Sequence, residues 1–79
     1  MNVRHPAVSV RNPPAELAAE VEARVRRQLG GRVSDLRVVV RGGGLALQGR
    51  ARTQHTRQLA QHAAMEATAL PIVANEIRV

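Results

Sequence analysis

Apolar residues recur along most of the chain with two spacings, one typical of helices and one typical of strands. Over residues 14–29 they share one arc at about 100° per residue, which predicts an amphipathic helix. The members of this arc are Leu17, Ala18, Val21, Val25 and Leu29. Pro14 suits the first helical position, because its missing N–H would have no helical partner there. Gly30-Gly31 is expected to end the helix, since glycine accepts a left-handed conformation.

Two alternating segments follow and flank a run of three glycines. The period of two predicts a β-hairpin with Gly42-Gly43-Gly44 as its turn. One set of alternating positions is apolar or small, and we expect it to face the core. This set comprises Leu36, Val38, Val40, Leu45, Leu47, Gly49 and Ala51.

A second helix and a last strand complete the pattern. Thr53 is a good N-cap, and the helix is expected to end near Ala69 or Leu70, just before Pro71. The positions that share its inner face are Thr56, Leu59, Ala60, Ala63, Ala67 and Leu70. The last strand is expected to carry Val73, Asn75, Ile77 and Val79 on one side.

The resulting order is helix, strand, strand, helix, strand. It predicts an α+β fold of the αββαβ type, in which two helices pack on one face of a three-stranded sheet and leave the other face open. Residues 14–79 form this domain. Residues 1–13 are either an N-terminal arm or a short edge strand around Val8–Val10. The order of the strands in the sheet stays open.

Three segments carry a family resemblance. Leu45-Ala46-Leu47-Gln48-Gly49 follows the glycine turn, Thr53 stands at a helix cap, and the chain closes on Val73-Ala74-Asn75-Glu76-Ile77-Arg78-Val79. In this order and spacing they resemble the BON domain (bacterial OsmY and nodulation), over about residues 15–79. The resemblance implies an αββαβ fold, a non-enzymatic role, association with phospholipid or membrane surfaces, and a part in envelope stress. The chain departs from the family at Ala69-Leu70-Pro71, where a Gly-Val pair is usual.

Composition narrows the function classes. The 79 residues include 12 arginines and no lysine, against 6 acidic residues, for a net charge of +6. The absence of cysteine excludes disulfides and thiolate metal sites. No apolar run approaches the ~20 residues of a transmembrane helix. Because residues 1–12 lack the apolar region of a signal peptide, we expect a cytoplasmic protein, peripheral at the inner membrane.

The arginines suggest a partner. If the apolar strand positions face the helices, alternation turns the basic ones onto the open face, with Glu76 as the lone acid there. The candidate anion- and lipid-binding residues are Arg37, Arg41, Arg50, Arg52 and Arg78. Guanidinium binds phosphate through two parallel hydrogen bonds. The hypothesis is therefore association with an anionic phospholipid surface, and the competing interpretation is an ordinary solvated polar face.

The alternative function is a structural, oligomerisation or protein-interaction module whose exposed sheet edges pair with another chain, including a second copy. Non-specific nucleic-acid binding ranks third, because the chain has no aromatic residue on which bases could stack.

The sequence contains no residue arrangement typical of a catalytic, cofactor-binding or metal site. His55 and His62 lie seven residues apart on the second helix, roughly 10.5 Å along its axis, too far to share one ion. His62 and Glu66 can pair, but two ligands do not make a metal site. No paired carboxylates or Ser–His arrangement stands out for acid–base or nucleophilic chemistry. We therefore expect no enzyme.

Overall fold

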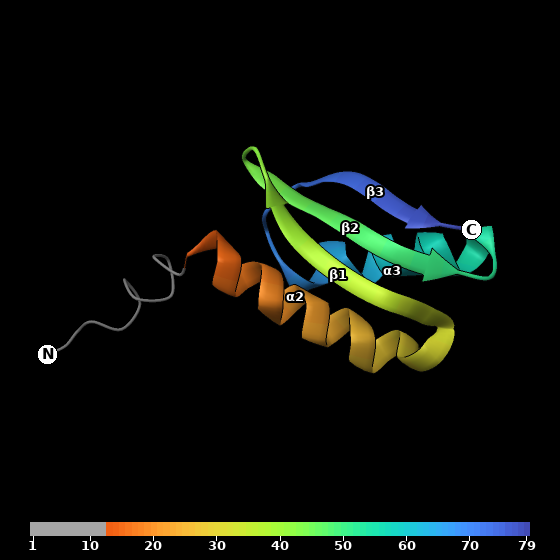
Figure 1. The fold of residues 1–79 in the computed structure, drawn as a ribbon. Coiled ribbons are helices and arrows are strands. Elements are labelled where there is room, and N and C mark those ends of the chain that lie inside the picture. Colours follow the sequence, from red (N-terminus) through yellow and green to blue (C-terminus); the bar gives the residue numbers. More distant parts are fainter. Residues whose placement is uncertain (1–12) are drawn as a thin grey trace, which may run out of the picture.

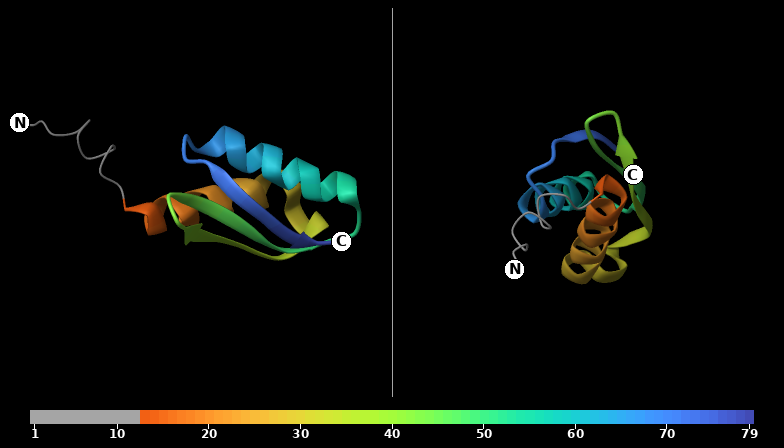
Figure 2. Two further views of the ribbon diagram at one scale, coloured as in Figure 1. Left: turned by 90° about the horizontal axis from the view of Figure 1, so that it is seen from above. Right: turned by 90° about the vertical axis from the view of Figure 1, so that its left-hand side faces the viewer.

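The computed structural model describes residues 13–79, and its elements follow the predicted order (Figure 1). They are α2 (Pro14–Leu29), a short 3-10 helix η2 (Gly30–Arg32), β1 (Val33–Arg41), β2 (Gly44–Ala51), α3 (Gln54–Ala67) and β3 (Ile72–Arg78). Both helices cover one face of the three-stranded sheet, and the opposite face is open (Figure 2). The predicted α+β fold is confirmed. The arm or edge strand expected before Pro13 lies outside the described residues.

Helix α2 begins and ends where the sequence predicts. The carbonyl of Pro13, the N-cap residue, accepts hydrogen bonds from the N–H groups of Glu16 (2.9 Å) and Leu17 (3.1 Å). At the other end Gly30 has a φ of 56°, and its N–H donates to the carbonyl of Arg26. Glycine adopts this conformation without steric cost, so the chain can turn into β1.

The strand order is β1-β2-β3, which the sequence left open. β1 pairs antiparallel with β2, and β2 pairs parallel with β3. A parallel pair needs a crossover connection, and α3 provides it. Leu45 and Leu47 of the central strand are completely buried. They pack with apolar residues of α2 and alanines of α3 in one core.

A bulge near the start of β1 changes the simple alternation. Asp35 and Leu36 together lie opposite the single residue Gly49, and Asp35 has a φ of 54°. Because a bulge adds one residue, it reverses the face of everything before it. Val33 and Leu36 are consequently both buried, although they are three positions apart.

Three apolar residues at strand ends are exposed, and one of them, Val40, was expected to face the core. Val40 is 44% exposed because the hairpin tip projects beyond the helices (Figure 2). Val73 is 51% exposed because the pairing of β2 with β3 shifts between Ile72 and Ala74, so that Ile72 packs on the core instead. Val79 is 65% exposed and lies beyond the end of β3.

Helix α3 ends at Ala67, earlier than the predicted Ala69 or Leu70. Thr68 is extended, with φ −151° and ψ 154°, and its hydroxyl oxygen accepts the N–H of Leu70 at 3.1 Å. A residue that precedes proline disfavours the helical conformation, so Pro71 keeps Leu70 out of the helix. The carbonyl of Pro71 then accepts the N–H of Leu45 at 2.9 Å, which joins this turn to β2.

Replacing Gly49 by alanine should destabilise the fold. Gly49 has a φ of 147°, and a Cβ there would lie 2.9 Å from the carbonyl oxygen of Ser34 and 3.3 Å from the Cα of Leu36. We expect Gly49→Ala to lower the free energy of unfolding in urea by about 2–4 kcal/mol. Gly43→Ala is the matched control, because its Cβ would meet nothing within 4 Å. It should change stability by no more than about 0.5 kcal/mol. Equal effects of the two variants would contradict this role of Gly49.

Candidate anion-binding surface

The open side of the sheet, here called the outer face, is organised in cross-strand rows. One row joins Arg37 of β1, Gln48 of β2 and Glu76 of β3, and the next joins Ser34, Arg50 and Arg78. Arg50 and Arg78 are therefore direct neighbours, and both are exposed. Like charges directly opposite each other in a sheet are destabilising. Within residues 13–79 neither guanidinium forms an ion pair, so this pair favours an anion from outside.

Arg41 also lies on the outer face, but it is engaged within the fold. Its guanidinium forms an ion pair with the carboxylate of Glu76, which also accepts a hydrogen bond of 3.2 Å from the side-chain amide of Gln48. The hydrogen bond from Arg41, followed by that from Gln48, lowers the pKa of Glu76 below its ordinary value of 4.5. Glu76 in turn raises the pKa of Arg41. Glu76 thus neutralises one of the arginines that the sequence assigned to anion binding.

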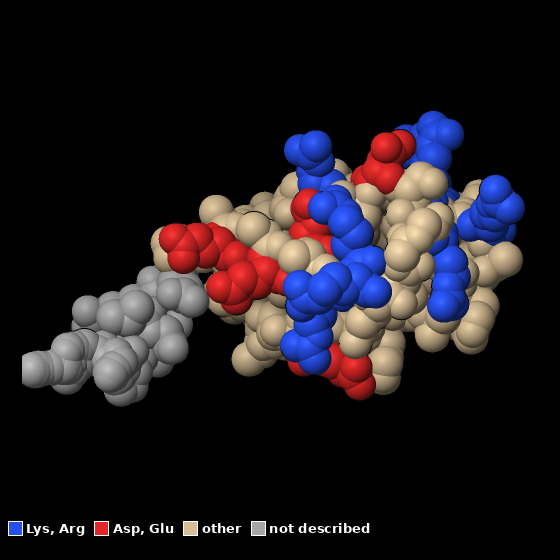
Figure 3. Space-filling model, turned by 90° about the horizontal axis from the view of Figure 1, so that it is seen from below, with Lys and Arg blue, Asp and Glu red and all other residues tan. Residues whose placement is uncertain are grey.

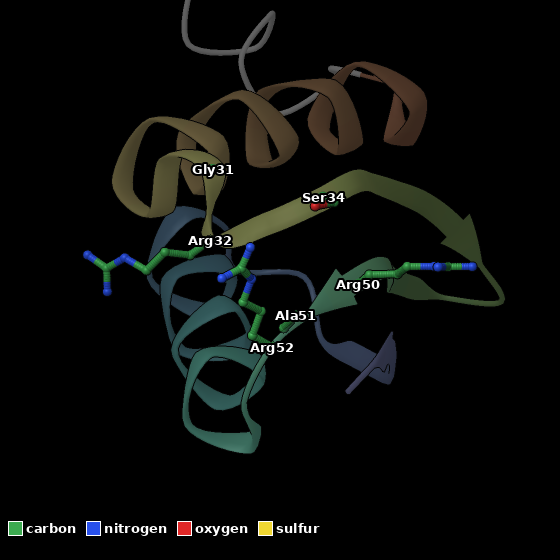
Figure 4. A pocket seen from close by; sticks show the side chains of 6 residues that line it. All are labelled: Gly31, Arg32, Ser34, Arg50, Ala51 and Arg52. Atoms are coloured by element: carbon green, nitrogen blue, oxygen red, sulfur yellow. The ribbon is translucent and has the colours of Figure 1, made fainter.

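Arg52 lies beyond the end of β2, at the end of the sheet where β1 begins. There it helps to line a depression of about 480 Å³ together with Gly31, Arg32, Ser34, Arg50 and Ala51 (Figure 4). We call this depression the end pocket. Arg32 extends outward from the end of η2, Arg52 extends from the turn after β2 toward the start of β1, and the side chain of Arg50 points away from both.

Of the five predicted arginines, the structure brings Arg50 and Arg78 together, places Arg37 on the same face and pairs Arg41 with Glu76. Arg52 sits at the end of the sheet. Sequence reasoning missed Arg32. Its position just before the first strand was the available signal, because the start of β1 must lie beside the end of β2 in an antiparallel hairpin.

The charged side chains are unevenly distributed. Seen from below, basic side chains extend over the middle and one end of the molecule (Figure 3). Acidic ones lie at the opposite end, where α2 begins, and also among the basic side chains and at the lower edge of this view. A surface of one sign steers encounter with a partner of opposite charge.

Side chains form hydrogen bonds with backbone groups along the unpaired edges of β1 and β3. On β1, the N–H of Val38 donates to Glu22 and the carbonyl of Leu36 accepts from Arg26, both at 3.0 Å. Glu22 and Arg26 are themselves an ion pair of 3.0 Å along α2. These contacts occupy the backbone groups that a further strand would need.

At the edge of β3, Asn75 takes part in the hydrogen bonds that occupy the backbone groups. Its side-chain amide donates to the carbonyl of Arg57 and to Gln61, both at 3.1 Å, and its side-chain oxygen accepts the N–H of Ile77 at 3.2 Å. Arg57 donates to the carbonyl of Asn75 at 2.7 Å. The asparagine of the closing strand pattern therefore fastens β3 to α3.

Other candidate chemistry remains sparse in the part of the chain that the structure describes. His62 and Glu66 pair at 3.2 Å along α3. Residues 13–79 hold no group of three histidine or acidic residues placed to bind a metal ion. No helix among these residues is long and apolar enough to cross a bilayer. Comparison with protein-family models, curated proteins and solved structures gives no match to this chain.

The Arg41–Glu76 pair predicts a pH dependence. Since folding lowers the pKa of Glu76, the pair stabilises the fold above pH 4.5, and this contribution is lost as the pH falls through the lowered value. In a carboxyl ¹³C NMR titration, the midpoint of Glu76 should lie below 4.5. In the variant Arg41→Gln it should rise toward the ordinary value. An unchanged midpoint in this variant would show that Arg41 does not hold the carboxylate.

Proposed function

We propose that the outer face binds an anionic phospholipid surface reversibly. Four arginines and one glutamate share this face, which gives it a net charge of +3: Arg37, Arg41, Arg50, Arg78 and Glu76. The single observation that carries the proposal is the cross-strand pair of Arg50 and Arg78, which repel each other until an anion lies between them. The resemblance to the BON domain points to the same class of ligand.

The contact is electrostatic and peripheral. Each basic residue near an anionic membrane contributes on the order of 1 kcal/mol, and salt screens this attraction within roughly 10 Å. The apolar members of the outer face are small or partly covered, since Ala46 is buried and Val39 is half-buried. They offer no bulky side chain for insertion between lipids. The membrane is bound through its head groups alone.

The geometry favours this function over assembly through sheet edges. Strand addition needs unpaired backbone groups, but Glu22 and Arg26 occupy those of β1 around Val38. Asn75 and Arg57 do the same on β3. Nucleic acid would meet the same arginines without any aromatic side chain to stack on its bases.

Removing two arginines from the outer face should weaken membrane binding. We expect Arg37→Gln/Arg78→Gln to bind vesicles of phosphatidylcholine and phosphatidylglycerol roughly 30-fold less tightly at about 0.1 M salt, because two contributions of about 1 kcal/mol are lost. Co-sedimentation measures this change. The control, Arg24→Gln/Arg27→Gln, removes the same charge from the exposed side of α2. Equal losses in the two variants would show that net charge, rather than this face, governs binding.

Removing the acid of the outer face should have the opposite effect. Glu76→Gln releases Arg41 and raises the charge of the face by one unit, so binding to the same vesicles should tighten roughly fivefold. Glu20→Gln on α2 makes the same charge change elsewhere and should alter binding by less than about twofold, because salt screens distant charges. Weaker or unchanged binding of the Glu76→Gln protein would refute the role of this face.

A further inference from the structure

The end pocket forms because of the register in which β1 pairs with β2. Val33 at the start of β1 pairs with Ala51 at the end of β2. The residues just outside this last pair, Arg32 and Arg52, are therefore brought to one pocket from positions 20 apart in sequence. Ser34 and Arg50, which pair with each other one step further in, complete its lining.

The charges of the end pocket are uncompensated by the rest of the described fold. Arg32, Arg50 and Arg52 are all exposed, and none forms an ion pair with any of residues 13–79. No carboxylate lines the pocket. The guanidinium groups of Arg32 and Arg52, which carry like charges at one depression, repel each other, and a bound anion of high charge would relieve that repulsion.

We propose that the end pocket binds one phosphomonoester group, held between Arg32 and Arg52. This inference rests on the proposed function and specifies the head group that the protein prefers. A phosphomonoester carries about −1.5 to −2 charges at pH 7 and presents three strong acceptor oxygens. Two guanidinium forks can each donate two parallel hydrogen bonds to such a group. A phosphodiester carries a single charge and satisfies fewer of these donors.

The pocket is also continuous with the outer face. Arg50 lines both the end pocket and a second depression of about 280 Å³ formed with Ala51, Arg78 and Val79. Its side chain points away from Arg52 (Figure 4). A phosphomonoester lipid head group can thus occupy the end pocket while neighbouring lipids contact Arg50 and Arg78. The end pocket determines the preference for phosphomonoester head groups, and the outer face attracts anionic lipids in general.

Vesicles of two compositions test the lipid source of the phosphate. We expect the protein to bind phosphatidic acid vesicles about tenfold more tightly than phosphatidylglycerol vesicles of equal surface charge. The variant Arg32→Gln/Arg52→Gln should lose this preference and still bind phosphatidylglycerol. Arg24→Gln/Arg27→Gln, with the same charge change on α2, should keep the preference. Thermal unfolding followed by circular dichroism shows whether the variants are folded.

Inorganic phosphate tests the soluble source. Phosphate, compared with chloride at equal ionic strength, should shift the Nε–Hε NMR signals of Arg32 and Arg52 but not those of Arg24 and Arg27. A shift without a preference for phosphatidic acid supports a site for a soluble phosphomonoester. Absence of both the shift and the preference, or a preference that survives in Arg32→Gln/Arg52→Gln, overturns the proposal. Failure to bind phosphatidylglycerol at all would instead overturn the proposed function.

Discussion

The pairing of β2 with the bulged start of β1 decides which side chains reach the outer face. Leu45 and Leu47 fix the inner side of the central strand, since both are completely buried. Gln48 and Arg50 must then point outward. The bulge opposite Gly49 brings Ser34 to the same side as Arg50, while Val33 stays in the core. A slip of one residue would exchange the two faces, so the basic surface and the hydrophobic core depend on a single register.

The helices have a second task besides covering the core. Glu22 and Arg26 of α2 bind the edge of β1, and Arg57 and Gln61 of α3 bind Asn75 at the edge of β3. In many small sheets an edge with free backbone groups pairs with a strand of another chain. Here these contacts occupy backbone groups in the middle of each described edge. The like charges of arginines on the outer face and at the end pocket, by contrast, have no ion-pair partner within residues 13–79, apart from Arg41. Hydrogen-bonded strand edges together with unpaired arginines favour an anionic partner over a further strand.

Much of the fold could be predicted because each element is encoded locally. The apolar arc from Leu17 to Leu29, the glycine turn and the Thr53 cap each carry their own signal. The deviations arise from tertiary pairing. The pairing irregularities at Asp35 and Val73 shift the alternation of inward and outward side chains. The residue types at these positions do not reveal the shift. Thr68 ends α3 early through a side-chain hydrogen bond that periodicity does not reveal.

The candidate site was predictable in part for the same reason. Strand alternation identifies Arg37, Arg50 and Arg78 as outward-facing residues, but it gives no information about partners in space. The pairing of Arg41 with Glu76 spans 35 positions. The presence of Arg32 and Arg52 at one pocket depends on where β1 and β2 start and end. Both facts follow from the register of the sheet, which sequence periodicity alone does not set.

The most direct test of the account is the orientation of the protein on a membrane. Paramagnetic relaxation from a gadolinium-labelled lipid in anionic bicelles broadens the NMR signals of the residues nearest the head groups. If the outer face lies against the head groups, broadening should be strongest for the backbone amides around Arg37, Arg50 and Arg78. Broadening centred on the exposed sides of α2 or α3, with these strand amides unaffected, would contradict it.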